Sequence, residues 1–206
     1  MGKWKDDSEF HIESHLDKPP KILTKAIELL QSDHDFGEGK MKHYIDEVAI
    51  KSTKLPGLRD YRFPGRDQDQ LFKSDYLHAS GDDCSACDTV QVEKRLSRNS
   101  DDPVVHYGLI ASGNAVMRSA EHRDKLRDVW GVICFEMEAA GLMDDFPCVV
   151  IRGICDYSDG HKHKLWQPYG AVVAAAYAKD LLRVIQPQEV ENLEEAAKMI
   201  KQGTFV

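Results

Sequence analysis

An alternation of apolar segments and helical patterns constrains the fold of this chain more than any other feature, and it begins at residue 88. Strand-like segments are expected at residues 88–94, 104–113, 131–137 and 148–156, and helices at residues 114–130, 138–145 and 168–185. The strand-like segments do not alternate with polar residues, which is typical of strands buried on both faces. We therefore predict an α/β fold of three layers, α/β/α, with a mixed, mainly parallel sheet.

The remaining segments define the expected domain organisation. A helix is expected at residues 18–31, where prolines precede a helical apolar pattern. Residues 52–88 are rich in proline, glycine and charge, and a long segment of this type is usually a functional loop or an insertion. We predict one domain over residues 1–186 and a polar helical tail or linker over residues 187–206.

Length and charge exclude several classes of function. The chain has 206 residues and a formal net charge of −8. It contains no apolar run of about 18 residues, so no membrane span or membrane partner is expected, and its start lacks the pattern of a signal peptide. Nucleic-acid polymers are not expected partners, because their affinity depends on Lys and Arg. This argument does not extend to a single nucleoside or nucleotide.

The five cysteines are an odd number and indicate free thiols in a reducing compartment, so a cytoplasmic location is expected. Cys134, Cys148 and Cys155 lie in or beside apolar runs, where cysteine behaves as a small buried hydrophobe. Cys84 and Cys87 form one CxxC pair, but no second pair of zinc ligands lies nearby in the sequence. We interpret this pair as a loop feature and predict neither a metal nor a cofactor.

Three of the expected strands end in short groups of residues that include polar or acidic side chains. These are Ser112, Gly113 and Asn114 at the end of 104–113, Glu136, Met137 and Glu138 at the end of 131–137, and Asp156 at the end of 148–156. Ligands of an open α/β sheet bind beyond the carboxyl ends of its strands, so these residues are expected to share one crevice. A glutamate carboxylate can accept hydrogen bonds from two adjacent ribose hydroxyls, and an aspartate at a partly buried strand end can hold and donate a proton.

Simpler interpretations of the same residues stay open. Acidic residues in a first helical turn are favoured by the helix dipole whatever their function. An aspartate after a strand is a common turn or cap residue. Arg152, within the third of these strands, is expected to pair with a buried carboxylate and to serve a structural purpose. The residues alone do not name a substrate.

The motifs "GLIASGN", "FEMEAAG" and "VVIRGICDYSDGHK" together resemble the superfamily of purine nucleoside phosphorylases, uridine phosphorylases and nucleosidases. The segments "DYRFPGRDQDQLF" and "HYGLIASGN" resemble its fungal branch, which is often joined to NTPase and repeat modules in multidomain, immune-receptor-like proteins. The motif matches cover about residues 95–186. The resemblance implies the three-layer fold of that superfamily and cleavage of the N-glycosidic bond of purine nucleosides or nucleotides.

The resemblance also implies a role for each site residue. Glu138, with Met137 and Glu136, would hold the ribose hydroxyls, and Glu138 would stabilise the cationic sugar. Asp156 would protonate the purine ring as the bond breaks, so Asp156 and Glu138 are the expected catalytic residues. The base pocket and the remaining substrate contacts would come from Val116, Met117, Ser112, Gly113 and Asn114. Phosphate or water would accept the sugar.

The chain departs from the superfamily pattern in its first 90 residues, where the early strands and the phosphate-binding segment have no counterpart. It is therefore expected to correspond to the C-terminal portion of the family domain. Sheet edges left exposed in this way favour association, so a homo-oligomer is expected. Two functions follow: a purine nucleoside-cleaving enzyme impaired by the missing part, or a non-catalytic nucleoside-binding or signalling module of a receptor-like protein.

Overall fold

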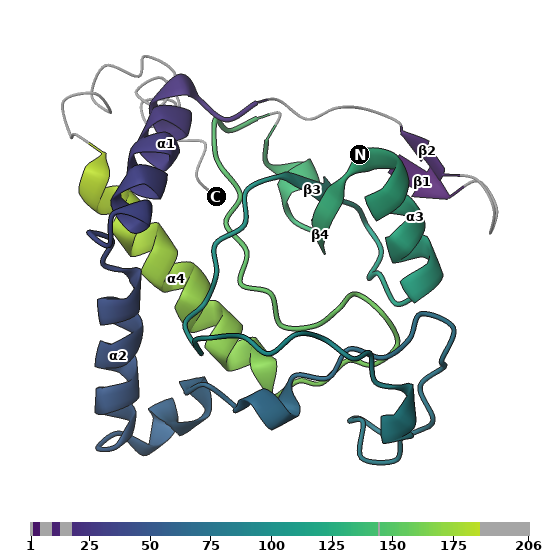
Figure 1. The fold of residues 1–206 in the computed structure, drawn as a ribbon. Coiled ribbons are helices and arrows are strands. Elements are labelled where there is room, and N and C mark those ends of the chain that lie inside the picture. Colours follow the sequence, from purple (N-terminus) through teal and green to yellow (C-terminus); the bar gives the residue numbers. More distant parts are fainter. Residues whose placement is uncertain (1, 5–9, 13–17, 144, 186–206) are drawn as a thin grey trace.

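The computed structural model describes residues 2–4, 10–12, 18–143 and 145–185 (Figure 1). Its α-helices are α1 (Lys21–Asp35), α2 (Met41–Ser52), α3 (Ala120–Trp130) and α4 (Trp166–Val184). Its strands are β1 (Gly2–Trp4), β2 (Phe10–Ile12), β3 (Leu109–Ser112) and β4 (Val132–Glu136). Four short 3-10 helices are η1 (Pro56–Tyr61), η2 (Arg66–Gln68), η3 (Thr89–Gln91) and η4 (Ala139–Gly141). The fold is mixed, with helices predominating.

The described sheet structure consists of two pairs of strands. Strands β1 and β2 pair in antiparallel fashion, and β3 and β4 pair in parallel, with Ser112 opposite Glu136 at the carboxyl ends. The parallel pairing agrees with the α/β prediction. The two strands and the helices of the described residues do not by themselves make a three-layer sandwich.

Two of the predicted strands are wrong. Residues 89–91 form η3, because the Asp88 side chain accepts a hydrogen bond from the Val90 amide at 3.0 Å and starts a turn; only Val92 makes a bridge, to Phe72. Residues 148–156 form no strand in the described structure. There Gly153 lies so close to Gly170 of α4 that a Cβ atom would overlap its carbonyl oxygen, and this packing on a helix replaces pairing with a neighbouring strand.

Three of the four predicted helices are confirmed with shifted bounds. The helix expected at 114–130 begins only at Ala120, because the Ser119 hydroxyl accepts from the His122 amide at 3.2 Å, and it ends at Gly131 with φ of 67°. The helix expected at 138–145 is reduced to η4. The helices expected at 18–31 and 168–185 are α1 and α4, and the predicted tail at 187–206 lies outside the described residues.

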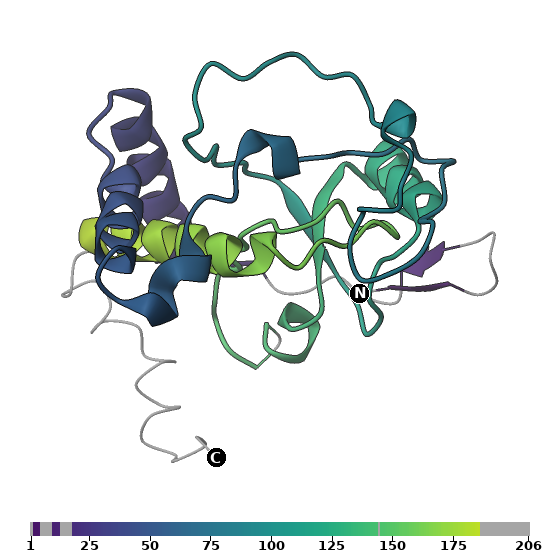
Figure 2. The same cartoon turned by 90° about the horizontal axis from the view of Figure 1, so that it is seen from below.

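The main core lies where α1, α2 and α4 meet. Figures 1 and 2 show these three helices grouped on one side of the molecule, with β3, β4 and α3 on the other. The buried core residues are Ala26, Leu30, Met41, Ala176, Tyr177 and Leu181, and Val149 and Ile151 of the extended segment 148–151 pack against them. None of the described helices is both long and apolar enough to cross a membrane.

Asp180 fixes the junction of the three helices and is fully buried. Its Oδ2 accepts hydrogen bonds from the backbone amides of Lys40 and Met41 at 2.7 and 3.0 Å, and therefore caps the start of α2. The same oxygen contacts His34 Nε2 at 2.9 Å, and Oδ1 accepts from Arg183 at 2.9 Å. We call this set of contacts the Asp180 clamp. Helix α2 was not expected from the sequence, since its cap comes from a residue about 140 positions away.

Candidate functional site

The ends of β3 and β4 meet as the parallel register predicts. Ser112 lies opposite Glu136, and the Gly113 amide donates to the Glu136 carbonyl at 3.2 Å. The chain after β4 turns back toward β3, where the Ala140 amide donates to the Ser112 hydroxyl at 2.9 Å. Two of the three predicted strand ends are therefore in direct contact.

Glu136 anchors this turn from within the protein. Its side chain is buried, and Oε2 accepts hydrogen bonds from the amides of Glu138 and Ala139 at 2.8 and 2.7 Å. Burial acts to raise the pKa of Glu136, but the Ser112 side chain and the two amides act in the opposite direction and prevail, so the pKa is lowered. The ionised carboxylate thus holds η4 in place, which is a structural role at the floor of the site.

Glu138 is the exposed carboxylate of the site. Its Oε2 accepts a hydrogen bond from Arg152 at 2.9 Å and another from the Met137 amide at 3.3 Å. The Glu138 side chain is 61% exposed and that of Arg152 40%, so both are available to a ligand. Arg152 was expected to pair with a buried carboxylate; that expectation is wrong, because its partner is exposed.

A cavity of about 220 Å³ opens beside this ion pair. Its lining is formed by Glu136, Glu138, Ala139, Leu142, Cys148, Val149, Val150, Ile151 and Arg152. The wall of residues 148–151 is apolar, whereas the other side carries the two carboxylates and the guanidinium. The space combines an apolar wall with a charged rim, as ligand sites do, but at about 220 Å³ it is smaller than the roughly 300–1,000 Å³ usual for them.

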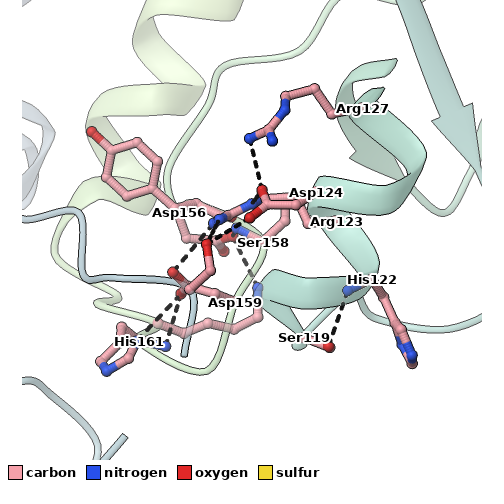
Figure 3. A network of polar contacts seen from close by, with 12 residues as sticks. Ser119, His122, Arg123, Asp124, Arg127, Asp156, Ser158, Asp159 and His161 are labelled. Carbon is pink, nitrogen blue, oxygen red and sulfur yellow. Dashed lines mark hydrogen bonds and ion pairs between the residues drawn. The ribbon is translucent and has the colours of Figure 1, made fainter. Parts of the chain in front are cut away.

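Asp156 lies in a different environment. Its Oδ1 contacts Lys162 Nζ at 2.9 Å and accepts from the Ser158 amide at 2.8 Å, and it is absent from the lining of the cavity. Figure 3 shows Asp156 in a polar network between α3 and the loop 156–161, in which Arg123 contacts the buried Asp159 at 3.5 Å. The Arg123 guanidinium also donates to the Tyr157 carbonyl at 2.9 Å. These contacts tie the loop to the helix.

Of the predicted site residues, only Glu136 and Glu138 border the cavity. Asn114 and Val116 are exposed, Met117 is half-buried, and Ser112, Gly113 and Met137 also lie outside the lining. The structure thus brings together Ser112, Gly113, Glu136 and Glu138, with the neighbouring Met137 43% exposed. Arg152 is the residue that the sequence interpretation missed as a site component. Its place in an apolar run beyond the second strand end was the available signal.

Comparison with known proteins gives one informative match. The chain is 44% identical, over 191 residues and 93% of its length, to a nucleotide-binding leucine-rich repeat (NLR)-like protein of the fungus Hyaloscypha variabilis. The match spans only 18% of that protein. No family model and no solved structure matches the chain. The chain is therefore similar to one segment of an NLR-like protein, and no nucleoside phosphorylase family is shown.

Proposed function

We propose that this chain is a nucleoside-recognition module of a larger, receptor-like protein and that it binds its ligand without cleaving it. The observation that supports this most directly is the exposed Glu138–Arg152 pair at the rim of the 220 Å³ cavity. The similarity to a segment of an NLR-like protein supports the receptor-like context. The purine nucleoside as ligand rests on the resemblance of the strand-end motifs.

The chemistry of the rim suits a ribose. The contacts of Glu138 with described residues go to Oε2, which leaves Oε1 to accept hydrogen bonds from sugar hydroxyls. Arg152 orients the carboxylate and adds donors for a ring oxygen or a phosphate. The exposed Met137 offers a polarisable surface to the face of the sugar.

Binding is favoured over cleavage because of Asp156. As a general acid, Asp156 would have to reach the base while a ligand occupied the cavity. Its carboxylate is instead engaged by Lys162 and by the Ser158 amide. N-glycosidic cleavage, by phosphorolysis or by hydrolysis, therefore rests on the sequence resemblance alone.

We also propose that the complete domain has the three-layer α/β/α fold that the resemblance implies. Its support is the parallel pairing of β3 and β4.

The test is calorimetric titration of the protein and of Glu138→Gln with purine ribonucleosides and their 2′-deoxy counterparts. Hydrogen bonds to charged groups contribute about 1.5–3 kcal/mol, so ribonucleoside affinity should fall roughly ten- to a hundred-fold, and deoxyribonucleoside affinity less. The matched control is Glu121→Gln, an exposed glutamate on α3, which should change neither. Equal losses of affinity for ribonucleosides and deoxyribonucleosides would show that Glu138 does not bind the 2′-hydroxyl. If the unmodified protein bound no nucleoside, the proposal of a nucleoside-recognition module would be refuted.

A second measurement separates recognition from cleavage. The protein is incubated with the same nucleosides, with and without phosphate, and free base is assayed. We expect none to be released. If base is released and Asp156→Asn abolishes the release while binding persists, the chain is the enzyme that the resemblance implies, and the non-catalytic proposal is wrong.

A further inference from the structure

A cluster of sulfur and nitrogen ligands lies away from the strand-end cavity. The thiols of Cys84 and Cys87 and one ring nitrogen of His78 all lie within 4.8 Å of one another. Cys87 is buried, and the other two are half-buried. The CxxC pair that looked isolated in the sequence is thus joined by a histidine from six residues earlier in the same loop.

The loop is already folded around these groups. The Cys87 amide donates to the Cys84 carbonyl at 3.1 Å, which makes the tight turn between the two thiols. His78 Nε2 lies 2.9 Å from the Asp83 carbonyl. A carbonyl can only accept, so Nε2 carries the ring proton and Nδ1 keeps a lone pair. Second-neighbour hydrogen bonds of this kind orient histidine ligands in metal sites.

His161 supplies an independent observation. Its side chain is 4% exposed, and its Nε2 is buried without a hydrogen-bond partner among the described residues. The ring is stacked on Phe72 at 4.3 Å and meets His78 edge-on at 5.4 Å between centroids. Its Nδ1 faces the Asp159 carboxylate at 3.9 Å, beyond hydrogen-bond distance, and the carboxylate favours the tautomer with the proton on Nδ1 and the lone pair on Nε2 (Figure 3). A buried lone pair without a partner is costly unless something binds it.

From these contacts we infer a structural zinc site formed by Cys84, Cys87 and His78, with His161 Nε2 as the fourth ligand. Two thiolates and two imidazoles are a preferred tetrahedral set for zinc, at bonds of about 2.3 and 2.0 Å. Ligand atoms around such an ion lie about 3.3–3.8 Å apart, so the atoms of His78, Cys84 and Cys87, which lie within 4.8 Å of one another, need to close by at most about 1.5 Å. His161 lies outside this group of close atoms, so its ring must move toward the other three to bind.

The position of the site in the fold explains what the metal would do. Between residues 69 and 88 the described chain has no helix and only the bridge from Phe72 to Val92. Phe72 is nonetheless 2% exposed, beneath the ring of His161. A metal joining residues 78–87 to His161 would fasten this loop to the loop 156–161, and hence to α3 through Asp159 and Arg123.

Another histidine of the same segment is the less suitable fourth ligand. His163 Nδ1 accepts a hydrogen bond from the Leu165 amide at 3.2 Å, so its Nε2 carries the proton. The lone pair of His163 is thereby already used, whereas that of His161 is not.

The experiment measures zinc in the full chain, purified with reduced thiols, by elemental analysis and by competition with a chromogenic chelator. We expect one zinc ion per chain. Cys84→Ser, Cys87→Ser and His78→Ala should each lower zinc affinity by more than the about 10–100-fold that loss of an outer partner costs. The matched controls are Cys134→Ser in β4 and the exposed His106→Ala, which should bind zinc as the unmodified chain does.

Cobalt identifies the fourth ligand. The Co²⁺-loaded chain should show the visible absorption bands of a tetrahedral ion and the charge-transfer absorption of two thiolate ligands. His161→Ala should weaken Co²⁺ affinity and shift the visible bands. An unchanged spectrum and affinity in His161→Ala would remove His161 from the site. A reduced chain that binds no zinc, retained affinity after loss of either cysteine, or a disulfide between Cys84 and Cys87 in place of metal would overturn the site altogether.

Discussion

Gly153 is the position where a single added methyl group should cost most. A Cβ atom there would overlap the carbonyl oxygen of Gly170, a backbone atom in the second turn of the core helix α4 that cannot rotate away. Gly153→Ala should therefore lower the free energy of unfolding by about 1–3 kcal/mol or more, through overpacking. The free energy of unfolding is measured by urea denaturation, followed by circular dichroism. Gly57→Ala is the control, because nothing lies within 4 Å of its added atom; equal midpoints for the two variants would contradict this packing.

The residues of the site were predictable only as far as the backbone determines them. The meeting of Ser112 with Glu136 follows from two parallel strands ending at one edge. The separation of Asp156 from the cavity could not be predicted in this way. It depends on the contact of Asp156 with Lys162, which lies in a loop without a periodic sequence pattern. The zinc ligand set was hidden for a similar reason: His161 reaches the CxxC loop through tertiary packing over more than 70 residues.

Helix α2 owes its start to the Asp180 clamp. Asp180→Asn removes the charge that the amides of Lys40 and Met41 and the side chains of His34 and Arg183 all contact, while it keeps the shape. Breaking a buried, charged set of this kind costs about 3–5 kcal/mol. Urea midpoints should fall accordingly for Asp180→Asn. Asp46→Asn, in an exposed pair with Lys42 on the same helix, should cost about 1 kcal/mol or less, and similar losses in both would refute the clamp.

Helices α1, α3 and α4 were easier to predict than the strands because their signals are local, unlike that of α2. Helix α3 is bounded by a serine cap and a glycine with positive φ, both visible in the sequence. The segments 88–94 and 148–156 are as apolar as strands, but a strand needs a partner, and the described structure gives one of them a turn and the other a helix to pack against. The apolar content therefore predicted neither the pairing nor the burial of these segments: Val90 is 76% and Ile154 57% exposed, and no residue of either segment is fully buried.

Acid should destabilise the whole molecule through its buried carboxylates. Burial raises the pKa of Asp180, but the hydrogen bonds from His34 and Arg183 prevail and lower it; the pKa of Glu136 is lowered as well. A lowered pKa means that the unfolded chain binds more protons as pH falls past about 4, so stability is present above that pH and is lost below it. The free energy of unfolding, measured by urea denaturation, should fall between about pH 5 and pH 3, and less steeply in Asp180→Asn. If it fell equally steeply in both proteins, Asp180 would not be a source of the acid sensitivity.

The Asp180 clamp also determines the order in which helices can become stable during synthesis on the ribosome. Ribosomes add about 5–20 residues per second, so roughly 7–30 seconds separate the synthesis of the α2 start from that of Asp180. During this interval the amides of Lys40 and Met41 have water as their partner, and short isolated helices are marginal in water. The start of α2 must therefore wait for α4, and a nascent chain that stops before residue 180 leaves it exposed to proteases and chaperones.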